Sequence, residues 1–269
     1  AIGGSLMENY NAALSEKVPY IVDTNHLDDP HVKANLLFQA HFSRLELPIT
    51  DYVTDLKSVL DQSIRIIQAM IDICANSGWL SSALTCMHLL QMVMQGLWFE
   101  KDSSLWMLPC MNESLFNDIS GKGISSLQEL LNLSKMNLQL ALQQSLHPDL
   151  YQELQHFPHV QVKLKLHEKH AKGLKQHLSI NLEKKNLKHT SRAFTPRFPK
   201  VKEEAWWLVL GNVSSSELFA LKRVSFSNRL LTRMELPSLA LTNLQELKLI
   251  LVSDCYVGFE HEYCIGDLI

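Results

Sequence analysis

The stretch Val160-Gln161-Val162-Lys163-Leu164-Lys165-Leu166 decides the fold class of this chain. Its apolar residues alternate with polar ones, and this period of two is typical of a β-strand that buries one face. The sequence before the stretch carries apolar residues at helical spacing, whereas the sequence after it contains short apolar runs separated by turns. We therefore predict an α+β chain in which the helices come first and the strands come last.

Six further runs have the length and composition of strands. They are His177–Leu182, Glu204–Leu210, Glu217–Val224, Arg229–Leu236, Glu246–Val252 and Phe259–Ile265. Seven short strands without a long helix between them favour an immunoglobulin-like or fibronectin-like β-sandwich over residues 157–269. The basic stretch Glu183–Lys202, which holds two prolines, is predicted to be a long exposed loop between strands.

The first 108 residues are predicted to form a helical bundle. Asp29 is a candidate N-cap with Pro30 at the first helical position, and this helix is expected to run to about Glu46. Two longer helices follow, at Asp51–Asn76 and Ser81–Trp98. Because the turn between them is tight, we expect them to pack as an antiparallel hairpin.

Residues 109–156 are predicted to form a small helix-loop-helix unit. Its helices are expected at Glu113–Ser120, Ser125–Leu131 and Leu138–Gln144. The turn Gly121-Lys122-Gly123-Ile124 is similar to that of a helix-hairpin-helix, in which backbone amides can hold a phosphate, so Lys122 is a candidate nucleic-acid contact. In the alternative interpretation, the glycines only reverse the chain and one of the two serines that follow caps the next helix.

The bulk composition excludes several classes of protein. The 269 residues are 46% hydrophobic and 20% charged, which is ordinary for a folded globular chain. A net charge of −3 means that any nucleic-acid contact must come from a local patch. The five cysteines contain no C-x-x-C pair, which favours a reducing compartment and predicts no zinc site. No apolar run reaches the roughly 18 residues of a membrane span, so no membrane partner is expected.

The sequence also lacks the motifs of common active sites. The Gly121-Lys122 pair has neither the preceding glycine nor the following Ser or Thr of a P-loop. The twelve histidines show no metal-ligand spacing, and no G-x-S-x-G motif marks a nucleophile. We therefore expect a chain that is not an enzyme by itself, with no catalytic residue, no metal and no cofactor.

One helix face is the main candidate for binding. Asp61, Arg65, Gln68 and Asp72 recur at intervals of four, three and four residues, so they share one polar side of the helix at Asp51–Asn76. The alternative is a helix face that is merely solvated.

A pair of tryptophans is the candidate site for a protein partner. Trp206 and Trp207 are adjacent in one predicted strand and so point to opposite faces, one into the core and the other onto a surface. An exposed tryptophan beside basic loops is typical of a partner anchor. The alternative is that a loop or the neighbouring domain covers it.

Five segments of the chain carry a family resemblance. They are Asp29–His41, Ala75–Leu80, Gln91–Trp98, Glu203–Trp207 and Ser253–Tyr256. Together they resemble the Sec63 homology domain of Ski2-like RNA and DNA helicases, and the likeness spans nearly the whole chain. It implies the order bundle, helix-loop-helix and immunoglobulin-like sandwich. It also implies a "ratchet" helix at Leu60–Trp79, in which Arg65 matches a strand-contacting arginine and Gln68 stands where relatives can carry a second one.

This resemblance implies a function as well. The chain would be a non-catalytic accessory module of a nucleic-acid helicase, which guides a single strand and docks partner proteins. Its partners would be upstream helicase domains of the same parent chain and subunits of a multiprotein complex in the nucleus and cytosol. The processes implied are DNA repair, transcription coactivation and RNA or ribosome quality control. A protein-interaction scaffold without nucleic-acid contact is the alternative.

Overall fold

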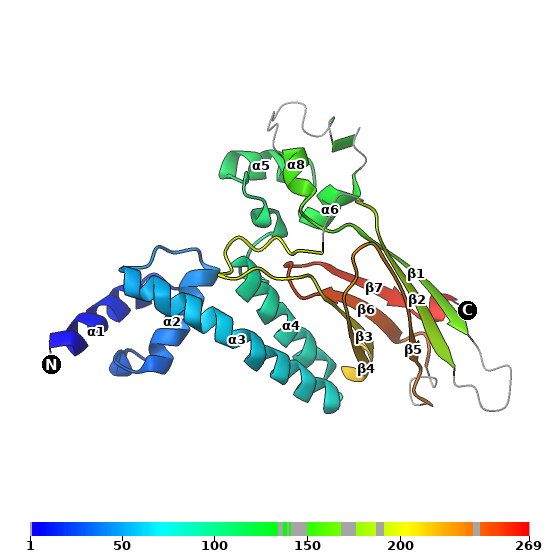
Figure 1. The fold of residues 1–269 in the computed structure, drawn as a ribbon, viewed down its shortest axis with the longest axis horizontal. Coiled ribbons are helices and arrows are strands. Elements are labelled where there is room, and N and C mark those ends of the chain that lie inside the picture. Colours follow the sequence, from blue (N-terminus) through cyan, green and yellow to red (C-terminus); the bar gives the residue numbers. More distant parts are fainter. Residues whose placement is uncertain are drawn as a thin grey trace.

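The computed structural model of the chain describes residues 2–133, 137–138, 140, 150–167, 176–186, 191–238 and 243–268. Four helices form one end of the molecule and a β-sandwich forms the other, with short helices above their junction (Figure 1). The predicted α+β fold class is confirmed. The divisions after residues 108 and 156 remain predictions, because one buried apolar cluster runs across both of them.

The helical end consists of α1 (Ile2–Ser15), α2 (Pro30–Phe42), α3 (Thr50–Asn76) and α4 (Leu80–Gln95). Asp29 caps α2 as predicted, since its side chain accepts a hydrogen bond from the backbone N–H of His31. The expected end of α2 at Glu46 was wrong, because Arg44 has a left-handed φ of 55° that interrupts the helix. The sequence patterns did not indicate α1.

α3 and α4 form the hairpin that the sequence predicts (Figure 1). Leu60 and Ile71 of α3 are buried in one cluster with Met87, Leu90 and Met94 of α4. The methionines of α4 therefore fill the core, where an unbranched and flexible side chain packs against irregular surfaces. This packing holds α3 against α4 from Leu60 to Cys74.

The middle part contains α5 (Glu113–Gly121), α6 (Leu127–Asn132) and α8 (Leu150–Leu154). Single 3-10 turns occur at Thr24–His26, Ser104–Met107 and Gly266–Leu268. Ser126 caps α6, since its side chain accepts a hydrogen bond from the backbone N–H of Glu129. The predicted helix at Leu138–Gln144 lies mostly outside the described residues.

The strand end is a sandwich of two antiparallel sheets. Its strands are β1 (Val160–His167), β2 (His177–Lys184), β3 (Trp206–Asn212), β4 (Glu217–Val224), β5 (Arg229–Glu235), β6 (Leu247–Ser253) and β7 (Glu260–Cys264). One sheet has the order β1-β2-β5 and the other the order β4-β3-β6-β7. All seven predicted strands are present, with boundaries shifted by at most two residues, and the immunoglobulin-like or fibronectin-like sandwich is confirmed.

β3 is buried on both of its faces, which decides where the two tryptophans lie. Trp206 belongs to the core between the sheets, whereas Trp207 belongs to the cluster between the sheet and the helices α3 and α4. Their exposed fractions are 1% and 3%. The prediction that the two tryptophans point to opposite faces of the strand is thus confirmed, but the expectation that one of them is exposed was wrong. Helices from the other end of the chain cover the outer face of the sheet, so neither ring is available to an outside partner.

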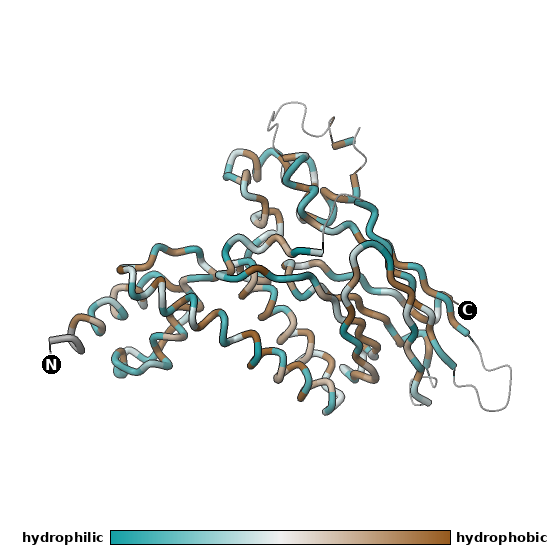
Figure 2. Tube along the Cα trace, in the orientation of Figure 1, coloured by the Kyte–Doolittle hydropathy of each residue, from teal (hydrophilic) through white to brown (hydrophobic). Residues whose placement is uncertain are grey.

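α4 joins the helices to the sandwich through polar contacts as well as apolar ones. Gln91 and Gln95 are almost fully buried, and their side-chain amides donate hydrogen bonds of 2.8 and 2.7 Å to the carbonyl oxygens of Ser253 and Cys255. Figure 2 shows hydrophobic residues along the middle strands of the sheet beside α4. A buried amide must find partners, so these bonds fix the position of α4 on the sheet.

The stretch after β2 differs from the prediction of an exposed loop at Glu183–Lys202. Residues 191–204 form a hairpin: Ala193 donates its backbone N–H to the carbonyl of Lys202, and Glu204 donates to Ser191. Phe198, near the tip of this hairpin, is buried in the cluster that contains α3 and α4. The basic segment is therefore exposed only in part, because its apolar residues anchor it against the helices.

His41 links α2 to α4 from inside the helical end. Its Nε2 lies 2.8 Å from the carbonyl oxygen of Val93, and burial lowers the pKa of the ring from 6.5 to about 4. The folded protein thus keeps His41 neutral, whereas the unfolded chain binds a proton below about pH 6.5. Protonation of His41 in the unfolded chain therefore lowers the free energy of unfolding as the pH falls from about 6.5 towards 4, and this loss is absent above pH 6.5.

We expect wild-type protein to lose about 2 kcal/mol more stability between pH 7.5 and pH 5 than a His41→Gln variant, whose amide can still donate to Val93. Urea unfolding at the two pH values measures this difference. The same pH dependence in His41→Gln and wild type would contradict the assignment.

Candidate nucleic-acid interface

The polar face of α3 lies on the side of the helix that α4 does not cover. Arg65 and Asp72 are exposed on it, while Asp61 and Gln68 are half-buried. Within the described parts of the chain, no hydrogen bond or ion pair holds the guanidinium of Arg65. The structure therefore places these four predicted residues together on one rigid helix, with a cation facing solvent.

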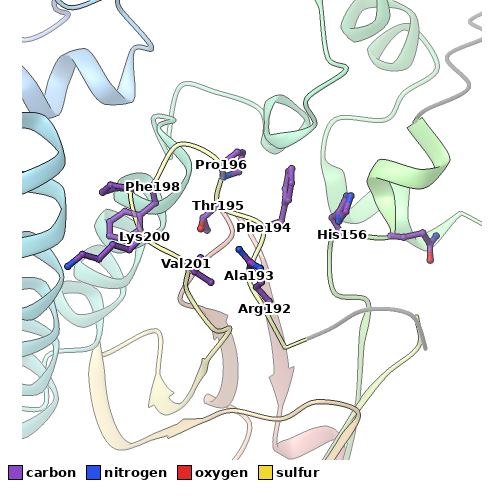
Figure 3. A pocket seen from close by; sticks show the side chains of 11 residues that line it. His156, Arg192, Ala193, Phe194, Thr195, Pro196, Phe198, Lys200 and Val201 are labelled. Atoms are coloured by element: carbon purple, nitrogen blue, oxygen red, sulfur yellow. The ribbon is translucent and has the colours of Figure 1, made fainter. Parts of the chain in front are cut away.

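Asp61 connects this face to the hairpin 191–204. The Nζ of Lys200 donates a hydrogen bond of 2.6 Å to Asp61, although the two residues are 139 positions apart. The side chains of Lys200 and Asp61 are 64% and 39% exposed, so solvent screens the ion pair and it adds little to stability. The bond shows that the hairpin lies directly beside the polar face of α3 (Figure 3).

A cleft of about 620 Å³ opens between this hairpin and the segment that follows α8. Figure 3 shows its lining. The lining residues are Gln155, His156, Arg192, Ala193, Phe194, Thr195, Pro196, Phe198, Pro199, Lys200 and Val201. The sequence predicts most of these residues to lie in one exposed loop. The two phenylalanines within this basic stretch could have indicated that part of it is buried.

Lys122 lies apart from this face. It follows α5, and Figure 1 shows α5 and α6 separated from α3. The backbone N–H groups of Ser125 and Ser126, which could hold a phosphate, already donate to the carboxylate of Glu129 at 2.6 and 3.3 Å. The hydrogen bond from Ser125 is the main reason why the pKa of Glu129 is lowered. Thus Ser126 caps the helix, and the structure does not bring Lys122 to the α3 face.

The described residues include no group of three or more His, Cys, Asp or Glu side chains that could hold a metal ion. In the same residues, no helix is long and apolar enough to cross a bilayer. Charge, exposure and rigid support coincide at the surface around α3.

Comparison with known proteins identifies the family. A family model described as the Sec63 Brl domain matches residues 8–266. The chain belongs to this family. The Sec63 match confirms the resemblance that the five sequence segments carry, and it covers the helical end, the middle part and the sandwich together.

Three relatives of this Sec63 chain are named helicases or subunits of a complex. The DExH-box ATP-dependent RNA helicase DExH14 of Arabidopsis thaliana is 63% identical over 97% of the chain and 12% of its own length. The human U5 small nuclear ribonucleoprotein 200 kDa helicase is 32% identical over 95% of the chain and 12% of its own length. Activating signal cointegrator 1 complex subunit 3 of Rattus norvegicus is 34% identical over 96% of the chain and 14% of its own length. The chain thus spans about an eighth of these relatives.

The family segments meet in the folded Sec63 chain. Ala205 and Asp254, which belong to two of them, exchange hydrogen bonds: the Ala205 N–H donates to the Asp254 carboxylate and the Asp254 N–H to the Ala205 carbonyl. Gln91 and Gln95 of a third segment bond to the carbonyls on either side of Asp254. These segments therefore form the junction between the helices and the sandwich. They hold α4 on the sheet, and α4 in turn packs against the buried side of α3.

Proposed function

We propose that this Sec63 chain is a non-catalytic accessory module that guides a single nucleic-acid strand past the ATPase domains of a helicase. Its partners would be upstream helicase domains of the same parent chain, which would bind and hydrolyse ATP. The proposal is supported by the helicase names of the relatives and by the small share of their length that this chain covers. DNA repair, transcription and RNA quality control, in nucleus and cytosol, are the processes that we propose for the parent.

The exposed Arg65 on α3 carries this proposal. A translocating strand needs contacts that are weak, repeated and blind to sequence. A guanidinium can hold a phosphate through two hydrogen bonds, and Gln68, one turn further on, can donate to a backbone or base oxygen. Because α3 is packed along α4, both groups are held at a fixed distance from the body of the protein.

The local charge balance fits such a role. The carboxylate of Asp61 is paired with Lys200, so the negative charge nearest to Arg65 on this face is compensated. With a net charge of −3 the isolated chain should bind a strand weakly. Weak binding suits an element that must let the strand pass.

Replacing Arg65 by Gln tests the proposal. In the parent helicase, we expect about tenfold less unwinding per ATP hydrolysed, because one charge-assisted contact to the moving strand is lost. A duplex-unwinding assay with parallel measurement of ATP turnover measures this ratio. Arg233→Gln removes the same charge from an exposed position on β5 and should leave the ratio unchanged.

An unchanged ratio in the folded Arg65→Gln protein would contradict the strand-guiding role. It would favour the alternative of a protein-interaction scaffold. The scaffold interpretation also requires that the wild-type chain show no salt-dependent binding to single-stranded RNA or DNA. The scaffold alternative relied on an exposed tryptophan as the anchor for a partner, and both Trp206 and Trp207 are buried.

A further inference from the structure

The hairpin 191–204 is a preorganised element. Three backbone hydrogen bonds lie within it, from Ala193 to Lys202, from Glu204 to Ser191 and from Phe198 to Thr195. In addition, Phe194 donates its backbone N–H to the hydroxyl of Tyr256 and accepts a bond of 3.0 Å from the side chain of Gln95. Buried Phe198 fixes the far end against the helices. The backbone from which side chains project into the cleft is therefore fixed before any ligand arrives.

The lining of the cleft combines two cations with a stacked aromatic pair. Arg192 and Lys200 lie on the hairpin, and no Asp or Glu is among the described residues that line the cleft. Phe194 stacks on His156 with ring centroids 4.8 Å apart and an angle of 16° between the planes. Figure 3 shows these two rings next to each other, and Lys200 pointing away from them towards α3.

We propose that this cleft is a second subsite for the guided strand and that it takes one nucleotide. Arg192 would bind its phosphate, Lys200 would bind the neighbouring phosphate on the α3 side, and the base would stack on the free face of the Phe194–His156 pair. This inference rests on the proposed function. Cations with aromatic rings are the elements with which proteins bind single strands without sequence preference. A cleft of about 620 Å³ also lies within the roughly 300–1,000 Å³ of small-ligand sites.

The position of the cleft makes it continuous with the α3 face. Lys200 bonds to Asp61, and Asp61 is one helical turn, about 6 Å along the axis, from Arg65. The ammonium of Lys200 has three donors, of which Asp61 uses one, so it can hold a phosphate while still paired. A strand that touches Arg65 can therefore reach the cleft by crossing one turn of α3.

Fluorescence anisotropy with a fluorescein-labelled twelve-nucleotide oligo-uridine tests the subsite in the purified chain. For Arg192→Gln we expect weaker binding and a log–log salt slope that is smaller by about 0.7, the value for one lost phosphate contact to a single strand. For Phe194→Leu we expect about tenfold weaker binding with an unchanged slope, because stacking is lost and charge is not. Arg233→Gln should match the wild type in affinity.

The outcomes separate this inference from the proposed function. If Arg65→Gln weakens binding but Arg192→Gln and Phe194→Leu stay within twofold of wild type, the cleft subsite is wrong and strand guiding stands. If the wild-type chain shows no salt-dependent binding, both fail. Should Phe194→Leu not fold, photocrosslinking of 4-thiouridine RNA to the wild type decides. Crosslinks within residues 192–200 support the subsite, and crosslinks confined to α3 overturn it.

Discussion

Replacing Trp207 by alanine is expected to destabilise the chain by about 3–5 kcal/mol, the usual cost of removing a buried aromatic side chain. Trp207 is 3% exposed and packs between the outer face of the four-stranded sheet and the helices. The cation of Arg223 also lies 5.5 Å from the centre of its ring. The substitution would leave a cavity at the junction that holds α3 in position.

Urea unfolding followed by circular dichroism measures this loss. Trp79 provides the matched control, since its side chain is 56% exposed at the start of α4. Trp79→Ala should cost less than about 1 kcal/mol, because little apolar surface leaves the interior. A Trp207→Ala protein as stable as Trp79→Ala, and weaker only in capturing partners, would restore the interpretation of Trp207 as a partner anchor.

The second large effect is expected at an ion pair inside the sandwich. Lys184 donates a 2.6 Å hydrogen bond to Glu204, and each side chain is only 1% exposed. The hydroxyl of Tyr256 donates to the other oxygen of Glu204, and the ring of Phe226 lies 5.3 Å from the Lys184 ammonium. Lys184→Met should destabilise the chain by about 3–5 kcal/mol, because it leaves a buried carboxylate without its cation.

A double variant distinguishes pairing from packing. Lys184→Met combined with Glu204→Gln removes both charges, and we expect it to recover at least half of the lost stability in urea unfolding. The solvent-exposed pair of Lys248 and Glu262 is the control, and Lys248→Met should cost less than about 1 kcal/mol. If the single variant Lys184→Met were as mild as Lys248→Met, the buried pair would not support the junction.

Both predictions concern the support of the α3 face. Glu204 leads directly into Trp206 and Trp207, and Tyr256 touches both Glu204 and the hairpin that carries Phe194. Damage at either site should therefore also weaken the strand binding that we propose for the α3 face.

The sequence alone determined the order of the strands and of most helices, although it did not indicate α1, and it determined most of their boundaries. The alternation at Val160–Leu166 and the helical spacing before it are local patterns, and the period of the side chains follows from the backbone itself. Local chemistry likewise indicated the Asp29 cap and the serine cap after the Gly121–Ile124 turn. The helix face of Asp61, Arg65 and Gln68 was predicted in the same way.

The tertiary structure decided which surfaces are covered and which side chains meet. A period of two shows that Trp206 and Trp207 point apart, but it cannot show that α4 covers the second face. The bond between Asp61 and Lys200 joins segments 139 residues apart, and the cleft beside it joins residues 155–156 to the hairpin 191–204. Burial and pairing of this kind depend on how layers pack against one another, and that information is spread over the whole chain and is absent from any single stretch of it.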